Sequence, residues 1–456
     1  MKIIIFGTGD SAKNFLNDIE ESINIIAFAD NNQAMWGKSL NNITIINPAK
    51  ILELDYDYII ICSMFTKEII ESLLARGIKR DKIIAYYDNF YTKEDREKEL
   101  FILNKITKQK KKGNKNIALL TRRNSGCNCL ALYKNVLPQI KDNFTVSLVG
   151  LEEYKQRLRE FEVVFTTHME SRNYRSMLNI ETWHGFPLKT LGFLEKNCID
   201  NITRADSGID YIISYSNFYN YIMSSVYKID IRKFIVTGMP RNDLLANAKA
   251  NDYISLLLNR KIENKRIIFY VPTFRSRKGK EKREGIEIFS QISELKLIDE
   301  YMREIDGYFI IKKHPVEEDL LELNNYTNIF FLTDENLTRL NIDFYEILGG
   351  SDILITDYSS VYFDYLLLNK PIIFWTKDID LYKERRGFLF ENVEVMMPGP
   401  RVKTAIELTE MIDRFINNPD WYSDERENIK KQVHLYDDFN SSQRVWNVFL
   451  DIYNNL

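Results

Sequence analysis

The chain is poor in cysteine, and this shortage excludes two kinds of small structural framework. Its 456 residues contain four cysteines, namely Cys62, Cys127, Cys129 and Cys198. They are too few and too scattered for a disulfide framework, and the Cys-x-Cys spacing is wrong for a usual zinc knuckle. The sequence therefore fits a reducing compartment.

Long apolar runs and net charge are also lacking. No run approaches the roughly 18 apolar residues of a membrane span, and the N-terminus enters a strand directly, with no signal-peptide pattern. We therefore expect a cytoplasmic protein. The 62 basic and 65 acidic residues leave a net charge of -3, which gives no bulk attraction to nucleic acid. Nucleic acid is not an expected partner. No metal site is predicted, and dependence on a divalent ion stays open.

The most informative stretch is residues 351–375, where an apolar strand runs into a turn rich in hydroxyl groups. The strand covers 353–356, the turn holds Asp357, Ser359 and Ser360, and a helix is expected over 361–368. Such side chains cap helices, and the positive end of a helix can hold an anion. The pattern predicts a phosphate-binding turn, although the same serines could merely cap a helix.

Residues 1–90 predict a small Rossmann-like unit. A strand at 2–6 leads into a glycine turn with Gly7 and Gly9, and a second strand ends at Asp30. In dinucleotide-binding proteins such glycines admit a pyrophosphate, while the acid holds a ribose. The unit is shorter than a usual NAD-binding domain, so we favour an accessory or docking role over cofactor binding.

Residues 91–116 predict a charged linker that ends in a run of lysines. Such a run is usually just solvated. Its functional interpretation is contact with an anionic polymer or an anionic membrane surface, where each lysine contributes on the order of 1 kcal/mol. That interpretation would place the protein peripherally on the inner face of the cell membrane.

Two larger α/β units follow, at 117–233 and 234–456. Apolar strands alternate with helices through both, which predicts two doubly wound parallel sheets facing one another. A strand at 234–237 is expected to open the second of these units. Two amphipathic helices, at 401–417 and 443–455, are expected to complete it and to pack around the hinge between the two units.

Polar clusters follow the ends of several expected strands. Ligands of doubly wound folds bind beyond the carboxyl ends of the strands, so these clusters should meet. Arginine, lysine, histidine and hydroxyl groups suit a diphosphate. The clusters supply these candidate substrate-binding residues: Lys189, Arg241, Thr273, Arg275, Lys313, Thr356, Asp357, Ser359 and Ser360. Two histidines, His184 and His314, lie in the same clusters and are the candidate catalytic residues.

The set of motifs resembles the CDP-glycerol glycerophosphotransferases, the teichoic-acid primases and polymerases. The motifs occur in the order typical of that family over residues 117–450, as Trp183-His184-Gly185, Gly238 with Pro240-Arg241-Asn242-Asp243, Pro272-Thr273-Phe274-Arg275, Lys313-His314-Pro315, Thr356-Asp357-Tyr358-Ser359-Ser360 and Arg386-Gly387-Phe388. The resemblance implies a GT-B pair of Rossmann-like domains. It also implies transfer of a polyol phosphate from a CDP-polyol such as CDP-glycerol to a lipid-linked or polymeric acceptor, with release of CMP.

Phosphodiester formation needs a base and groups that neutralise phosphate charge. His184 is the candidate base because it follows a strand directly and matches the family histidine. His314, with Lys313 and Arg275, is expected to bind the diphosphate, and Arg241 to assist. For Asp357 three roles stay open: capping the helix, orienting a cation, or facing the hydroxyls of the nucleotide or polyol.

Departures from the family pattern bear on the substrate. Phe186 stands where a small hydroxyl residue is usual, Ser276 replaces a common acid, and 438–444 match only in part. Two alternatives stay open: a GT-B glycosyltransferase that uses a nucleotide sugar, and a nucleotide-sensing protein that acts through residues 1–90. His168 and His434 lack comparable neighbours and are expected to be structural.

Overall fold

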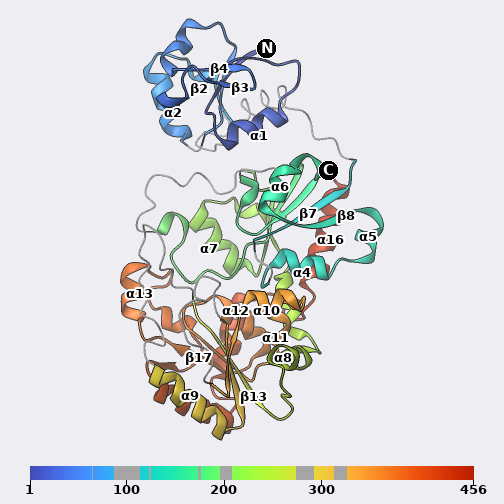
Figure 1. Cartoon of the computed structure of the whole chain (residues 1–456), viewed down its shortest axis with the longest axis vertical. Coiled ribbons are helices and arrows are strands. Elements are labelled where there is room, and N and C mark those ends of the chain that lie inside the picture. The colour runs from blue at the N-terminus through green and yellow to red at the C-terminus, as the bar shows by residue number, and fades with distance from the viewer. Residues whose placement is uncertain are drawn as a thin grey trace.

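The chain folds around three six-stranded sheets (Figure 1). The computed structural model describes residues 1–63, 65–86, 113–122, 125–172, 176–195, 208–273, 292–312 and 326–456. Each sheet forms its own α/β unit, in the order expected for a pair of doubly wound units preceded by a smaller one. Within the described ranges no helix is both long and apolar enough to cross a bilayer.

The first sheet has the order β3-β4-β2-β1-β5-β6, and only the β3/β4 pair is antiparallel. Its elements are β1 (Lys2–Phe6), α1 (Asp10–Asp18), β2 (Asn24–Ala29), β3 (Ser39–Leu40), β4 (Ile43–Ile46), β5 (Tyr58–Ile61), α2 (Thr66–Ala75) and β6 (Ile83–Ala85). Isoleucines on its central strands are buried on both faces, as parallel strands covered by helices require.

The second sheet is wholly parallel, with the order β12-β11-β10-β9-β7-β8. Its elements are β7 (Asn116–Thr121), α4 (Asn128–Lys134), α5 (Pro138–Asn143), β8 (Thr145–Gly150), α6 (Leu151–Gln156), β9 (Val163–Thr166), β10 (Leu178–Glu181), β11 (Tyr211–Ser214), α7 (Asn217–Tyr227) and β12 (Phe234–Val236). Strand β12 pairs with β11. The prediction that this strand opens the third unit is therefore wrong, because its hydrogen bonds extend the second sheet.

The third sheet is also parallel, with the order β15-β14-β13-β16-β17-β18. Its elements are α8 (Ala250–Leu258), β13 (Arg266–Val271), α9 (Ile292–Glu304), β14 (Gly307–Lys312), β15 (Ile329–Leu332), α10 (Asp334–Arg339), α11 (Phe344–Leu348), β16 (Ile353–Thr356), α12 (Val361–Tyr365), β17 (Ile372–Trp375), α13 (Ile379–Arg385), β18 (Arg401–Val402), α14 (Ala405–Asn417) and α15 (Ser423–Val433). Helix α12 is shorter than expected, because the chain continues from Leu366 to Leu368 as a 3-10 turn.

The last helix, α16 (Ser441–Asn454), returns to the second unit. Its Tyr453 hydroxyl donates to Glu162 Oε1 at 2.7 Å, and its Trp446 ring lies 5.5 Å from the ring of Phe165 on β9. Figure 1 accordingly shows this red helix beside β7 and β8. Sequence alone counted the helix within the third unit and expected it to pack around the hinge; these contacts place it on the second unit.

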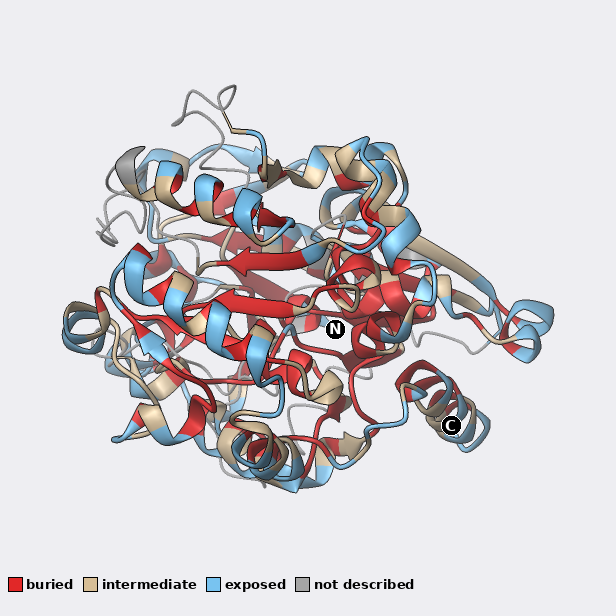
Figure 2. Ribbon diagram, turned by 90° about the horizontal axis from the view of Figure 1, so that it is seen from below, coloured by how far each residue is buried: buried red, intermediate tan, exposed pale blue. Residues whose placement is uncertain are grey.

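The second and third units share one apolar core. Figure 2 shows buried residues concentrated on the central strands and exposed residues on the outer helices. A single cluster of buried side chains runs from β7 through to α16 and includes both units. Phe186 belongs to it: the side chain is buried, and its ring lies 4.6 Å from that of Phe363 on α12. The family departure at Phe186 is thus a packing residue between the two units.

Candidate active site

The third sheet has a topological switch point between β13 and β16. Strand β13 pairs with β14 on one side and with β16 on the other, so the chain leaves the two strands in opposite directions. Ligands of doubly wound folds bind in the crevice that such a reversal opens at the carboxyl ends of the strands. Thr273 follows β13 and Asp357 follows β16, which places both at this crevice.

Asp357 joins the two strand ends. Its carboxylate accepts hydrogen bonds from the Thr273 backbone N–H at 2.8 Å and from Thr273 Oγ1 at 2.6 Å. Lys189 Nζ, from the second unit, donates to Thr273 Oγ1 at 3.2 Å. Asp357 is fully buried. Asp357 thus accepts from the residue that follows β13, at the contact between the second and third units, here called the seam, and this is a role that sequence reasoning did not consider.

Lys189 is held at the seam by backbone pairing between the units. It forms an antiparallel bridge with Phe388, and the N–H of Thr190 donates to the carbonyl of Gly387 at 3.2 Å. The Arg386-Gly387-Phe388 motif therefore fixes the segment that carries Lys189. The amine of Lys189 also lies 5.7 Å from the centre of the Tyr382 ring.

His184 is an exposed imidazole in the loop after β10. Its Nδ1 lies 2.9 Å from the carbonyl oxygen of Thr167. A carbonyl can only accept, so Nδ1 carries the proton and Nε2 presents a lone pair. The His184 ring also stacks on the ring of His168, with centroids 4.2 Å apart and planes 10° apart. This tautomer is the one that a general base needs.

The loop that carries His184 packs directly on the turn before α12. Gly185 has φ +151°, and a Cβ added there would lie 2.5 Å from Ser360 Oγ and 3.3 Å from Arg241 Nη2. Glycine is therefore required for this close approach. Ser359 and Ser360 are half-buried, and Ser360 makes no side-chain cap bond to α12. The histidine loop and the serine turn thus form one continuous surface across the seam.

Arg241 and Thr356, two predicted substrate-binding residues, are engaged inside the protein. Arg241 is buried, and its Nη2 lies 2.5 Å from Asp364 Oδ2 on α12. Burial works against its charge, but Asp364, with Tyr345 and Tyr215 beside it, outweighs that effect and holds the pKa of Arg241 above its usual range. Arg241 Nη1 also donates to the carbonyl of His184 at 2.9 Å. The hydroxyl of Thr356 donates to the Val271 carbonyl at 2.7 Å.

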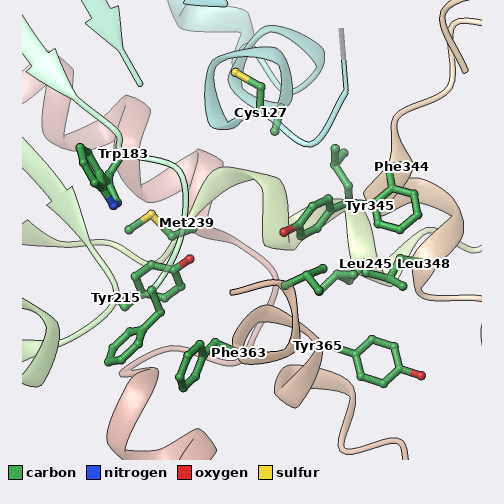
Figure 3. Packing of buried hydrophobic residues seen from close by; sticks show 14 of the residues in the cluster. Cys127, Trp183, Tyr215, Met239, Leu245, Phe344, Tyr345, Leu348, Phe363 and Tyr365 are labelled. Carbon is green, nitrogen blue, oxygen red and sulfur yellow. The ribbon is translucent and has the colours of Figure 1, made fainter. Parts of the chain in front are cut away.

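Two buried tyrosines also bond to Asp364, and together with Arg241 they form a buried polar cluster, here called the Asp364 node. The hydroxyls of Tyr215 and Tyr345 donate to Asp364 Oδ1 and Oδ2 at 2.8 and 2.7 Å. In Figure 3 the hydroxyl ends of the two rings point toward the same space. Asp364 thereby collects donors from both units.

Two acidic residues that sequence reasoning missed accept hydrogen bonds from the loops that carry His168 and His184, here called the histidine loops. Glu181 accepts from the backbone N–H groups of Met169 at 2.8 Å and Trp183 at 2.7 Å. Both donors are non-glycine residues with positive φ, 59° and 52°. Glu170 accepts from the N–H of His168 at 2.8 Å. The only sequence signal was their place beside strand ends at the same edge of the sheet.

Glu181 should make the stability of the protein depend on pH. Burial, and then repulsion by Glu170, raises its pKa from 4.5 to about 8. Between these values the folded protein holds a proton that the unfolded chain has lost, so stability should fall as pH rises from about 4.5 to about 8. We expect Glu181→Gln to flatten this fall in urea denaturation midpoints measured from pH 5 to pH 8. Parallel pH curves for the variant and the wild type would contradict the assignment.

Three predicted ligands of the diphosphate, Arg275, Lys313 and His314, lie outside the described residues. In the sequence Lys313 directly follows β14, which ends at Lys312. Within the described ranges no cluster of three or more histidine, cysteine or acidic side chains could hold a metal ion. His434, expected to be structural, is buried and its Nε2 donates to the Phe363 carbonyl at 2.7 Å.

The glycine turn of the first unit is tightly packed. Gly7 has φ +109°, and a Cβ there would lie 2.5 Å from the Cys62 carbonyl oxygen. Thr8 Oγ1 donates to Asp30 Oδ2 at 2.5 Å, and the N–H of Asn32 donates to Asp30 Oδ1 at 2.8 Å. Gly9 is the N-cap residue of α1. The acid predicted to hold a ribose is therefore already paired within its own unit.

The fold and the seam define a two-domain transferase of the nucleotide-dependent class. Residues 138–451 match the family described as CDP-Glycerol:Poly(glycerophosphate) glycerophosphotransferase. The match covers more than half of the chain, which therefore belongs to this family and is an enzyme of it. Residues 1–84 match a separate family described as C2185-like, N-terminal.

Individual relatives support the same family. The chain is 29% identical to the teichoic acid poly(glycerol phosphate) polymerase of Bacillus spizizenii, over 64% of this chain and 80% of that one. It is 31% identical to the teichoic acid poly(ribitol-phosphate) polymerase of the same organism, over 40% of this chain and 29% of that one. The solved structure of the wall teichoic acid polymerase TagF covers 86% of this chain and 97% of its own, with TM-score 0.62 and 22% identity. This likeness supports the predicted GT-B fold.

Proposed function

We propose that the enzyme transfers a polyol phosphate from a CDP-polyol, with CDP-glycerol as the first candidate, to a hydroxyl of a lipid-linked or polymeric acceptor. The single observation that carries this proposal is the hydrogen bond between His184 Nδ1 and the Thr167 carbonyl. Because Nδ1 is committed to this carbonyl, Nε2 can accept a proton at a seam that also presents Ser360 and Lys189. Family membership supplies the class of donor.

The proposed step is a displacement at phosphorus. Nε2 of His184 takes the proton of the acceptor hydroxyl, and the acceptor oxygen bonds to the phosphorus that carries the polyol. The bond from that phosphorus to the CMP oxygen breaks, and CMP leaves with the electron pair. In this proposal Ser359 and Ser360 donate hydrogen bonds to the phosphoryl oxygens, and Lys189 neutralises part of their charge. Arg275, Lys313 and His314 are proposed ligands of the diphosphate, from their sequence positions after β13 and β14.

A donor panel tests the proposal. Purified protein is incubated with a polyol-phosphate acceptor and with CDP-glycerol, CDP-ribitol, UDP-glucose or UDP-N-acetylglucosamine, and the nucleotide released is identified. We expect CMP from at least one CDP-polyol and no UDP. UDP release from a sugar donor would favour the glycosyltransferase alternative on the same fold. The two CDP-polyols are needed because both glycerol-phosphate and ribitol-phosphate polymerases are among the relatives.

We infer an accessory role for the first unit. Both carboxylate oxygens of Asp30 are paired within the unit. Asp10 occupies the first turn of α1, so a negative charge already lies where a pyrophosphate would approach the helix end. These two acids argue against the nucleotide-sensing alternative. A peripheral position on an anionic membrane surface stays a proposal that rests on the lysine run in residues 105–115.

A further inference from the structure

The loop after β9 makes two separate contacts with the His184 ring. The Thr167 carbonyl accepts from Nδ1 at 2.9 Å, and the His168 ring lies on the face of the His184 ring at 4.2 Å with a 10° tilt. The hydrogen bond to Thr167 fixes the position of Nδ1, and the stacked ring restricts the tilt of the imidazole plane. Together the two contacts define the direction in which Nε2 points.

His168 is itself fixed from several sides. Its backbone N–H donates to Glu170 Oε2 at 2.8 Å, and its Nδ1 lies 2.8 Å from Thr167 Oγ1. Glu170 Oε1 is also paired with Arg122 Nε at 2.6 Å. The next residue, Met169, is held in its left-handed conformation by the bond to Glu181. The ring that packs on His184 is therefore attached to a rigid loop.

Glu181 connects this loop to the loop of His184. One carboxyl oxygen accepts from Met169 and the other from Trp183, the residue before His184. The Trp183 ring also lies 4.2 Å from the His184 ring. The relative position of the two histidines is thus determined by one buried side chain that bonds to both loops.

We propose that His168 is a positioning residue for the transfer reaction, and that it acts by stacking on the His184 imidazole. The inference rests on the proposed function, in which His184 is the base. Orientation of a reacting group contributes to the rate of the chemical step without tightening substrate binding. His168 should therefore affect kcat and leave KM for the donor unchanged.

Two substitutions separate stacking from other roles of His168. Phenylalanine keeps an aromatic face but cannot transfer a proton, whereas alanine removes the face. We expect His168→Ala to lower kcat for CMP release about 10-fold at constant KM. We expect His168→Phe to stay within about threefold of wild type. Equal losses in the two variants, or no loss in His168→Ala, would overturn the proposal.

A measurement without substrate keeps the inference testable if the donor proves to be different. The chain has only four histidines, so histidine-labelled protein gives four imidazole Cε1–H signals, and His184→Gln identifies that of His184. We expect His168→Ala to shift this signal through the lost ring current, and to leave that of His434 in place. An unmoved His184 signal would overturn the stacking, whatever the donor panel shows.

Discussion

Replacing His184 with glutamine should lower kcat for nucleotide release by about 100- to 10,000-fold, the range expected when a general base is removed. Glutamine can still make a hydrogen bond near the Thr167 carbonyl, but it cannot accept the proton of the attacking hydroxyl. The measurement is the initial rate of CMP release from the CDP-polyol that the donor panel selects.

Folding and donor binding serve as controls for this variant. The His184 residue is exposed, and its ring contacts lie at the surface rather than in the core, so the thermal denaturation midpoint should change little. The diphosphate ligands proposed from the sequence lie after β13 and β14, in the third unit, so donor affinity measured by calorimetry should also persist. A folded variant that binds the donor but does not release CMP would identify the chemical step as the one lost.

Retained CMP release in His184→Gln would show that another residue acts as the base. The described residue that could take over is His168, whose ring lies on that of His184. The double variant His184→Gln/His168→Phe distinguishes this possibility, since it removes both imidazoles and keeps an aromatic face. Activity that survives in the single variant and disappears in the double variant would assign the base to His168.

Much of this site could be predicted because it lies at strand ends. Apolar runs located the strands, and parallel strands bring their carboxyl ends to one edge. The prediction therefore grouped Lys189, Thr273 and Asp357 correctly, although they are far apart in the sequence. Their bonds could not be predicted, because the pairing of Thr273 with Asp357 depends on β13 and β16 being neighbours in the sheet.

The histidine loops were the hardest part to foresee. Met169 and Trp183 adopt positive φ, a conformation that sequence patterns associate with glycine or asparagine rather than with methionine or tryptophan. Their conformations depend on Glu181, whose partners lie on two different loops. His168 consequently looked isolated in the sequence, and was expected to be structural.

The boundary between the second and third units was misplaced for a related reason. Strand β12 and helix α16 each lie next in the sequence to elements of the third unit, but their hydrogen bonds and ring contacts are with the second. Proximity along the chain is only a tendency in α/β folds. Long-range packing decides the assignment.

Replacing Asp364 with alanine should destabilise the protein by about 3–5 kcal/mol, the usual cost of leaving one partner of a buried ion pair uncompensated. The Arg241 guanidinium would remain buried without its carboxylate, and the hydroxyls of Tyr215 and Tyr345 would lose their acceptor. Urea denaturation measures the change. The exposed pair of Arg232 with Asp230 provides the matched control, since Arg232→Gln should leave the midpoint unchanged.

The double variant Arg241→Met/Asp364→Leu tests whether the uncompensated charge of Arg241 causes the loss of stability in Asp364→Ala. Apolar residues of similar size can replace a buried ion pair with little loss of stability, so this variant should be clearly more stable than Asp364→Ala. It should not recover activity, because Arg241 also donates to the carbonyl of His184. The two effects would then have different causes. The Arg241–Asp364 pair stabilises the contact between the two units, while the Arg241 bond to the His184 carbonyl supports catalysis. A double variant as unstable as Asp364→Ala would show that the tyrosine bonds, rather than the buried charge, dominate this node.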